Sequence, residues 1–375
     1  MKEKIVAKYI LLKLASRCNI NCSYCYWFLD EDVYKKPAIM TERVEEAFIS
    51  KLEKHIKKNT LTDFFILFHG GEPMLFGKIR FIEFVMKLRQ LESCIENFTL
   101  KLAITTNGIL IDSDWIDIFK LLNISVTLSI DGNKEMHDLN RVDFKNQGTY
   151  DKVIQALDLL KKGGIHFGLL AVYNPLMNAK TIFNFFVKEL ECNNFDILVP
   201  DSNHDKQTDT IANFYTELFD IWYEYSNNNK INIRLMESIS KGILGIESNS
   251  ESIGYGQITT FTLLTDGSLE PLDVLRVAGT GFTKTRFNIF ENEFEDIQQD
   301  ELWEEIRRAS VTLPEKCQKC KYSFACGGGH IAHRYSKQNG FNNNSVYCDD
   351  YINIFNHCEK KISNDIYHNK QNTFS

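Results

Sequence analysis

The sequence predicts an α/β fold, a partial (β/α)6 barrel followed by a smaller C-terminal region. Between residue 9 and about residue 225, short β-branched or aromatic runs alternate with longer segments of helical period, as in repeated βα units around a parallel sheet. The 375 residues are 43% hydrophobic, enough to bury one large core or two unequal ones. Because six strands are expected rather than eight, an open or partial barrel is favoured over a closed one.

The expected strands are short apolar, β-branched or aromatic runs. They are Tyr9 to Leu14, Asp63 to His69, Leu100 to Thr105, Ser125 to Ile130, His166 to Tyr173 and Phe195 to Pro200. Helices are expected between them, for example where apolar residues recur at every fourth position from Val44 to Ile56. A second such pattern, Tyr150 to Lys162, stops at Gly163-Gly164, as the C-terminus of a helix commonly does.

Polar stretches at 226–230 and 247–252 indicate loops or boundaries, so a second region is expected to begin near residue 229. Within it, 261–270 reads as a hairpin, because Asp266-Gly267 is a strong turn signal between apolar runs. We expect four parts: the barrel at 1–228, a bridging hairpin and helical region at 229–310, a cysteine-rich domain at 311–360, and a polar, frayed tail at 361–375.

Charge and hydropathy exclude several classes of partner. The formal net charge of −7 offers no broad basic surface for nucleic acid or an anionic membrane. No apolar run reaches about 18 residues, and the first residues contain lysines but no signal-peptide core. We therefore expect a cytoplasmic protein without nucleic-acid or membrane partners.

Ten cysteines in a reducing compartment raise the question of metal binding before that of disulfides. Cys94 and Cys192 stand alone in helical surroundings and are expected to be small buried hydrophobes. Cys18, Cys22 and Cys25 form a CX3CX2C group in the loop after the first strand. Three thiolates can hold a four-iron cubane with one iron left open for a ligand. A zinc knuckle fits less well, because zinc prefers paired CX2C arms and a fourth ligand.

This loop resembles that of the radical SAM enzymes, in which CX3CX2C ligates a [4Fe-4S] cluster whose open iron chelates S-adenosylmethionine. Further segments match the family's motifs in order, at the carboxyl ends of successive strands, where barrel enzymes place their chemistry. The resemblance implies that Glu72 meets the cofactor's amino group, Arg141 its carboxylate, and Leu170 and Val172 its adenine. The full set of implied cofactor-binding residues is Gly70, Gly71, Glu72, Pro73, Thr106, Asn107, Ser129, Asp131, Arg141, Leu170 and Val172.

The second cysteine group has the pattern CX2CX5C followed by a more distant cysteine. Its members are Cys317, Cys320, Cys326 and Cys348. Four thiolates close a cluster completely, which suits electron relay, although the same four could hold a zinc ion that staples the C-terminus. The block resembles the SPASM extension of radical SAM peptide-modifying enzymes, which carries auxiliary [4Fe-4S] clusters.

This chain departs from the complete SPASM pattern. Leu272 and His330 stand where that pattern has cysteines, so the resemblance implies one auxiliary [4Fe-4S] cluster instead of two. We expect His330 to hydrogen-bond or pack, and Cys358, which lies beyond the pattern, to be structural.

Three further stretches, beginning near Leu198, Asp266 and Cys326, resemble the cyclophane-forming peptide maturases. Those enzymes join an aromatic ring to a β-carbon in a ribosomally made precursor peptide. The implied partners are that peptide and an electron donor such as flavodoxin or ferredoxin. The resemblance implies Asp273 as the base that takes the ring proton, and we expect Asp201 and His204 to contact the substrate.

Two alternatives remain open at the level of the sequence. One is an anaerobic sulfatase-type maturase that forms formylglycine, a class that normally has both auxiliary clusters. The other is a non-catalytic binding module stapled by zinc. How a leader segment is recognised is not decided by the sequence, although addition of a strand to a sheet edge is one possible mode.

Overall fold

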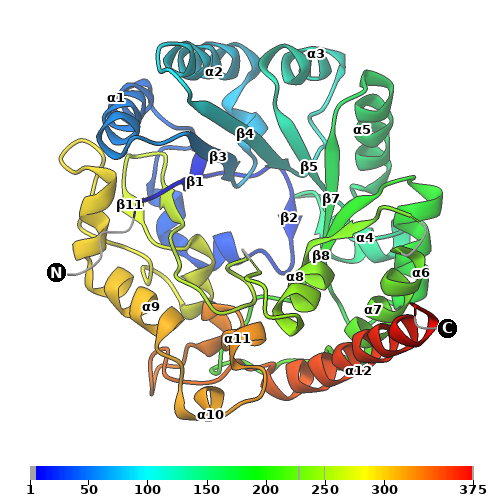
Figure 1. Cartoon of the computed structure of the whole chain (residues 1–375). Helices are drawn as coiled ribbons and strands as arrows, with labels where there is room; N and C mark the ends of the chain where they lie inside the picture. Colours follow the sequence, from blue (N-terminus) through cyan, green and yellow to red (C-terminus); the bar gives the residue numbers. More distant parts are fainter. Residues whose placement is uncertain (1–5, 227–228, 249, 374–375) are drawn as a thin grey trace. The chain divides into compact units, whose positions relative to one another are not determined.

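The structure, a computed structural model, describes residues 6–226, 229–248 and 250–373 (Figure 1). It divides into two compact units. The first contains the described part of Met1–Ile130, together with Lys134–Leu169 and Thr259–Glu304. The second contains Asp131–Asn133, Leu170–Ile258 and the described part of Glu305–Ser375. This division differs from the boundaries expected from composition, because the hairpin at 261–270 belongs to the first unit.

The first unit is built on a sheet with the strand order β11-β10-β1-β3-β4-β5. Strands β1, β3, β4, β5 and β10 are parallel, and only β11 runs antiparallel, to β10. The bounds are β1 (Tyr9–Ala15), β3 (Asp63–Gly70), β4 (Thr99–Thr106), β5 (Ser125–Ser129), β10 (Phe261–Leu263) and β11 (Leu269–Glu270). In register, Ile10 of β1 lies between Ile66 and Phe261. Parallel pairing aligns the carboxyl ends of β1, β3, β4 and β5 at one edge.

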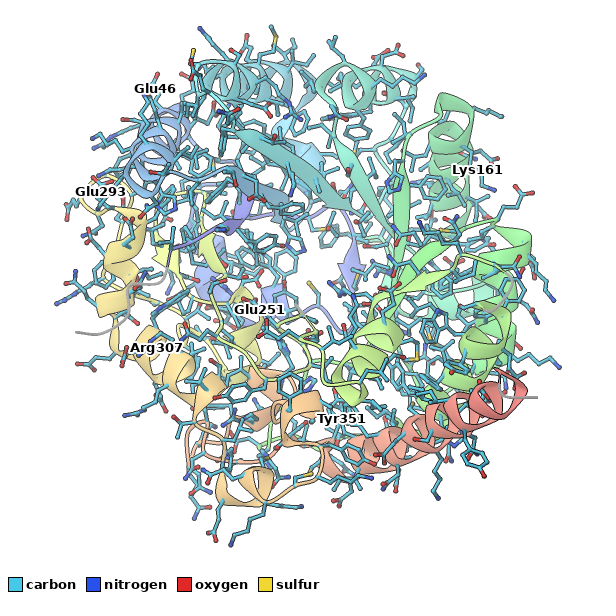
Figure 2. All side chains as sticks on the ribbon, in the orientation of Figure 1. Glu46, Lys161, Glu251, Glu293, Arg307 and Tyr351 are labelled. Carbon is cyan, nitrogen blue, oxygen red and sulfur yellow. The ribbon has the colours of Figure 1, made fainter. Side chains whose placement is uncertain are left out.

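Helices cover the outer face of this sheet (Figure 1). They are α1 (Glu42–Asn59), α2 (Lys78–Ser93), α3 (Ser113–Leu122) and α5 (Tyr150–Gly163). Helix α1 begins after Thr41, whose side chain accepts a hydrogen bond from the backbone N–H of Val44. Its residues from Val44 to Ile56 at fourfold spacing are all buried, while Glu46 is exposed on the opposite side (Figure 2). This amphipathic pattern explains the docking of α1 on the sheet.

The second unit contains the parallel strand pair β8 (Asn194–Leu198) and β9 (Asn232–Ile233). Strand β7 (Phe167–Val172) carries the chain from the first unit into the second. The helices of this unit are α6 (Ala179–Asn184), η4 (Phe185–Glu189), α7 (Ala212–Ser226), α8 (Arg234–Ile243), α10 (Glu315–Gln318), α11 (Ser323–Cys326), η7 (Ile331–Arg334) and α12 (Cys348–Thr373). Helix α9 (Glu301–Val311) spans the boundary between the units.

Most of the predicted elements are confirmed. All six expected strands are present, and helix α5 ends at Gly164, whose φ of +64° is the left-handed conformation that glycine favours. The hairpin forms with Gly267 at φ +87° in its turn. Two polar stretches expected as loops include residues 227–228 and 249, and the lysine-containing start includes residues 1–5, which all lie outside the described residues.

Two expectations are wrong. The tail is not frayed from residue 361, because α12 continues to Thr373; residues 374–375 lie outside the described part. Buried Phe355, Cys358 and Ile362 recur along α12 at helical spacing, so one face of the helix packs against the unit. Cys94 is exposed, since it caps the C-terminus of α2, whereas Cys192 is buried as expected. None of the described helices is long and apolar enough to cross a bilayer.

Candidate active site and cysteine centres

Cys18, Cys22 and Cys25 come together in the loop that follows β1. The short strand β2 (Asn21–Cys22) pairs with β6 (Arg141–Val142), and the backbone N–H of Cys25 donates to the carbonyl of Cys22 at 3.2 Å. Burial, together with the negative charges of Glu72, Cys22 and Cys25, raises the pKa of the Cys18 thiol to about 12. The thiols therefore lie close together in a site where thiolates require a positive partner, as an iron–sulfur cluster supplies.

Gly70 and Gly71 allow the chain after β3 to approach the segment that leads to Cys18. The N–H of Gly71 donates to the carbonyl of Ala15 at 2.9 Å, and the N–H of Glu72 donates to that of Arg17 at 2.8 Å. A Cβ on Gly71 would lie 2.1 Å from the carbonyl oxygen of Arg17. No side chain fits there, so the glycine is required by close backbone packing.

Glu72 joins the ends of β3 and β4. Its carboxylate accepts hydrogen bonds from the N–H of Met74 at 3.0 Å, the hydroxyl of Thr106 at 2.8 Å and the N–H of Asn107 at 2.9 Å. Burial raises the pKa of Glu72 to about 7, although these three bonds oppose the shift. Pro73 occupies the start of η3 (Pro73–Phe76). In the structure Glu72 thus organises the loop, and its contact with a cofactor amino group stays a prediction.

Asn107 and Arg141 lie against the cysteine loop. The side-chain amide of Asn107 donates to the sulfur of Cys18 at 3.6 Å, and one guanidinium nitrogen of Arg141 lies 4.0 Å from the sulfur of Cys22. Arg141 also lies over the ring of Tyr24, 5.5 Å from its centroid. These contacts give the thiolates hydrogen-bond donors and a positive charge, both of which stabilise ligating sulfur.

The remaining predicted cofactor residues follow β5 or lie on β7. Ser129 is the buried last residue of β5. Asp131 is fully buried, and its carboxylate accepts a hydrogen bond from the N–H of Val172 at 3.1 Å. Leu170 and Val172 are half-buried and alternate with fully buried Leu169 and Ala171 along the strand. Leu170 and Val172 therefore share one face of the strand, which is less buried than the face of Leu169 and Ala171.

Asp273, the expected base, is buried at the start of η5 (Asp273–Ala278). It forms an ion pair with Lys13 of β1 and accepts a hydrogen bond from the hydroxyl of Tyr26 at 2.8 Å. Burial raises the pKa of Asp273, but the Lys13 ammonium and His69 outweigh burial and hold the pKa well below its ordinary range. Asp273 is therefore an ionised carboxylate near the Cys25 loop.

Lys13, His69 and Tyr26 surround Asp273, and none of them was assigned a role from the sequence. The ammonium of Lys13 donates to Nδ1 of His69 at 2.8 Å. Burial lowers the pKa of His69 to about 3, and the nearby Lys13 contributes, so this ring is neutral. The sequence did contain a signal that Lys13 has a role, because this residue is a cation within the otherwise apolar strand Tyr9–Ala15.

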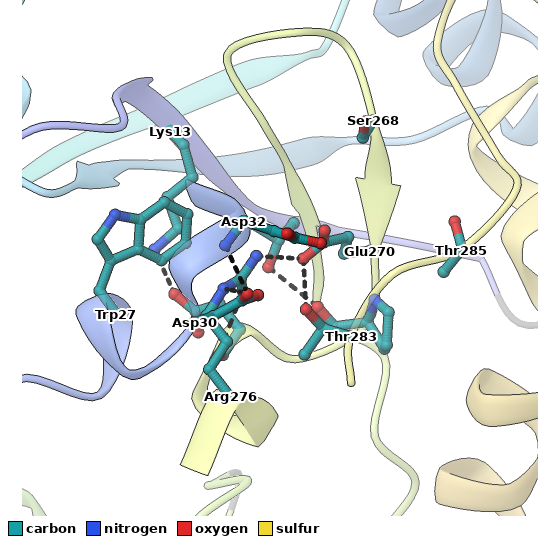
Figure 3. Close-up of polar contacts among 12 residues, drawn as sticks. Lys13, Trp27, Asp30, Asp32, Ser268, Glu270, Arg276, Thr283 and Thr285 are labelled. Atoms are coloured by element: carbon teal, nitrogen blue, oxygen red, sulfur yellow. Dashed lines mark hydrogen bonds and ion pairs between the residues drawn. The ribbon is translucent and has the colours of Figure 1, made fainter. Parts of the chain in front are cut away.

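Arg276 fixes the turn that carries Asp273 (Figure 3). Its side chain is fully buried and pairs with the carboxylates of Asp30 and Glu270. The guanidinium also lies over the ring of Trp27, 4.3 Å from the centroid, and Thr283 donates to Glu270 at 2.7 Å. This buried network links the hairpin region to the segment after Cys25, because Trp27 and Asp30 belong to that segment.

The second cysteine group lies within the second unit. Cys317, Cys320, Cys326 and Cys348 line one cavity of about 210 Å³, together with aromatic side chains that include Tyr351 of α12 (labelled in Figure 2). Burial raises the pKa of Cys326 to about 12, and the neighbouring cysteines add to the effect. Four convergent thiols around a cavity fit a closed metal centre, in which the metal would supply the compensating positive charge.

Arg334 organises the chain around this cavity. Its buried guanidinium donates to three backbone carbonyls, those of Ala309 at 2.7 Å, Phe341 at 3.0 Å and Asn343 at 3.1 Å. Cys358 is fully buried on α12 and is not among the residues that line the cavity. Leu272, at the position where a cysteine was expected, is likewise buried.

Asp201 and His204 lie in the loop after β8, beside the segment that contains His330. The N–H of His204 donates to the carbonyl of Tyr335 at 2.9 Å, and its Nε2 is 2.7 Å from the carbonyl oxygen of Asn344. Nδ1 of His330 is 3.8 Å from a carboxylate oxygen of Asp201. The predicted substrate contacts are thus part of a junction between two segments of the chain.

The chain is similar to one known superfamily and to individual enzymes along most of its length. Residues 12–182 match the Radical SAM superfamily. The chain is 29% identical to the cysteine-type anaerobic sulfatase-maturating enzyme of Clostridium perfringens strain 13, an alignment that covers 95% of this chain and 97% of the relative. It is 25% identical to the serine-type enzyme of Bacteroides thetaiotaomicron, with 93% of this chain and 89% of the relative covered.

Solved structures show the same fold. The structure of native anSMEcpe with bound AdoMet has a TM-score of 0.81 and 27% identity, covering 95% of this chain and 98% of the other. Streptococcus suis SuiB bound to the precursor peptide SuiA has a TM-score of 0.65 and 17% identity, covering 92% and 76%. The second likeness supports the fold alone.

Proposed function

We propose that this radical SAM enzyme joins an aromatic ring to a β-carbon within a ribosomally made precursor peptide. The cofactors of the enzyme are S-adenosylmethionine and [4Fe-4S] clusters, one that binds S-adenosylmethionine and one auxiliary. Because the chain is an enzyme, the alternative of a non-catalytic binding module stapled by zinc is not retained. A peptide substrate is supported by similarity over nearly the whole chain to enzymes named for maturation of another protein.

We assign the open cluster to Cys18, Cys22 and Cys25 and the closed cluster to Cys317, Cys320, Cys326 and Cys348. Two observations support this assignment. In the first group, Cys22 and Cys25 lie close enough to Cys18 to raise its pKa, and the thiols of the second group line one cavity. Asn107 and Arg141, which contact Cys18 and Cys22, provide the donors and charge that a ligating thiolate needs.

The reaction assigns distinct tasks to residues of this chain. A [4Fe-4S] cluster held by Cys18, Cys22 and Cys25 would, together with S-adenosylmethionine, supply the radical chemistry that removes one hydrogen atom from a β-carbon. The carbon radical adds to the aromatic ring, which must then lose one proton and one electron. Asp273, which Lys13 holds ionised, would accept the proton, and a cluster held by Cys317, Cys320, Cys326 and Cys348 would supply the electron acceptor. A flavodoxin or ferredoxin supplies the electron that starts the cycle.

The pairing of one three-cysteine site with one four-cysteine site carries this proposal. Leu272 and His330 stand at the cysteine positions of the complete SPASM pattern, and Leu272 is buried. A second candidate is oxidation of a Cys or Ser side chain to formylglycine. The specific observation in its favour is the 29% identity to the Clostridium perfringens enzyme along the length of both chains.

Mass spectrometry of reaction products separates the two candidates. Reduced, cluster-reconstituted enzyme is incubated with S-adenosylmethionine and either a peptide with repeated aromatic-X-X segments, encoded beside the gene, or a sulfatase-type peptide with a Cys or Ser target. Crosslinking removes two hydrogens and leaves a segment that resists fragmentation. Formylglycine instead gives an aldehyde that a hydrazide reagent captures.

Two matched variants control this assay. Cys22→Ala should abolish release of 5′-deoxyadenosine, because two thiolates do not hold the open cluster, whereas Cys358→Ala should retain it. Crosslinked product supports the proposed function, and aldehyde product transfers the assignment to the second candidate. Wild-type turnover by Cys22→Ala would refute the assigned cluster site.

A further inference from the structure

Asp201, His330 and His333 converge within the second unit, although they are distant in sequence. One ligand atom from each lies within 4.8 Å of the others. Asp201 comes from the loop after β8, and the two histidines come from the cap and third residue of η7. The two imidazole rings meet edge to face with their centroids 5.3 Å apart. Two imidazoles and a carboxylate therefore share one small volume.

Among these three residues, His333 gives the strongest evidence for a bound ligand. It is 2% exposed, yet within the described residues neither of its ring nitrogens has a partner in hydrogen-bond geometry; the carbonyl of Pro200 is nearby. Burial lowers the pKa of His333 well below its ordinary value, and His330 adds to the effect, so the ring is neutral with a lone pair available. Buried polar groups without a partner are rare and commonly mark a missing ion or water.

The backbone around these side chains is held on both sides. The hydroxyl of Tyr347 donates to the carbonyl of Pro200 at 3.1 Å, directly before Asp201. The N–H of Val346 donates to the carbonyl of His333 at 2.9 Å, and the N–H of His204 donates to that of Tyr335 at 2.9 Å. The loop after β8 and the segment around η7 are thus placed side by side before any ligand binds.

We propose that Asp201, His330 and His333 bind one divalent first-row transition-metal ion such as Zn²⁺. Imidazole nitrogens suit such ions, whereas Mg²⁺ and Ca²⁺ prefer oxygen ligands throughout. Three protein ligands leave a fourth position open for water or a substrate group. Ligand atoms about 2.0–2.1 Å from one ion are roughly 3.4 Å apart in a tetrahedron. Nδ1 of His330 is already 3.8 Å from a carboxylate oxygen of Asp201, and all three ligand atoms lie within 4.8 Å of one another, so small side-chain rotations would complete the site.

This site is separate from the two cysteine centres and does not depend on the reaction proposed above. Its ligands are nitrogen and oxygen atoms, and it gives His330 a role in place of the hydrogen-bonding or packing role expected from sequence. The ion would lock the loop after β8, which also carries His204, onto η7. Bound metal should therefore slow hydrogen exchange in residues 199–206.

The test is a zinc-binding measurement on the holoenzyme. Anaerobically reconstituted protein, with iron and sulfide measured, is treated with a mild chelator and titrated with Zn²⁺ against a chromophoric competitor. Asp201→Asn and His330→Asn each remove one ligand from a side chain that is more exposed than that of His333, so they should fold even where His333→Asn does not. Asp205, in the same loop, accepts a hydrogen bond from the backbone N–H of Lys337. Asp205→Asn is the matched control.

Wild-type protein and Asp205→Asn should each bind one Zn²⁺ per chain, while Asp201→Asn and His330→Asn should bind it at least about tenfold more weakly with iron content unchanged. Slower exchange of residues 199–206 on zinc addition should appear in the first pair only. Absence of stoichiometric zinc binding in wild type overturns the site. Equally tight binding by all variants overturns it as well, since the ion would then lie elsewhere.

Discussion

Lys13 and Asp273 form an ion pair although 260 residues separate them in sequence, and their side chains are only 0% and 5% exposed. Lys13 lies on β1 and Asp273 opens the turn after the hairpin strands. The pairing of β10 with β1 brings them together. A buried charge with a single strong partner is sensitive to the loss of that partner, which makes the pair a direct test of both fold and chemistry.

Replacing Asp273 alone should lower both stability and product formation. Asp273→Asn leaves the Lys13 ammonium buried without a counter-charge and should cost about 3 kcal/mol of unfolding free energy. The double variant Lys13→Met with Asp273→Leu should recover most of that loss in urea unfolding. Asp273→Asn should still cleave S-adenosylmethionine while forming little crosslinked product. Crosslinking at the wild-type rate would show that Asp273 is not the base.

Gly71 should not tolerate even one added methyl group. Gly71→Ala places a Cβ 2.1 Å from the carbonyl oxygen of Arg17, so the segment that leads to Cys18 must shift. A shift of about 1 Å at a catalytic centre can cost roughly a hundredfold in rate. The readout is 5′-deoxyadenosine release. Gly256→Ala, where the added Cβ meets nothing within 4 Å, is the matched control and should behave as wild type.

His69 should make stability depend on pH below neutrality. Its folded-state pKa of about 3 lies below the ordinary value of 6.5, so the unfolded chain binds more protons between these values. Stability is therefore complete above pH 6.5 and falls as pH decreases through that window. Between about pH 7.5 and about pH 5.5 the loss should be roughly 1.4 kcal/mol in urea unfolding.

His69→Gln keeps an acceptor for Lys13 but cannot take up a proton, so it should lose this part of the pH dependence. The exposed His166→Gln is the control and should retain it. An unchanged pH profile in His69→Gln would contradict a buried neutral imidazole at position 69.

The two buried C-terminal cysteines Cys317 and Cys358 should differ sharply in metal content. Cys317→Ser should reduce iron from about eight to about four per chain, because it removes a ligand of the closed cluster. Cys358→Ser should retain all iron, since Cys358 does not line the cysteine cavity. Iron and sulfide analysis under anaerobic conditions gives the readout. Full iron retention in Cys317→Ser would disprove the assigned auxiliary site.

Local patterns in the sequence were sufficient for the strands and for the two cysteine groups. The six predicted strands are confirmed. They could be predicted because an alternating or continuous apolar pattern depends only on a few neighbouring residues. The cysteine spacing identified the two thiol groups for the same reason. The frayed tail was wrong because polar composition concealed the apolar stripe that includes Phe355, Cys358 and Ile362.

Only the tertiary structure decided which of those elements pack against one another. Pairing of β10 with β1 placed the hairpin and Asp273 in the first unit, beside Lys13 and the neutral His69. Packing of the loop after β8 against η7 brought Asp201 to His330 and His333. Periodicity and spacing specify which residues form an element. Contacts across hundreds of positions depend on how elements pack, and those contacts set the charge of Asp273 and the convergence of the two histidines.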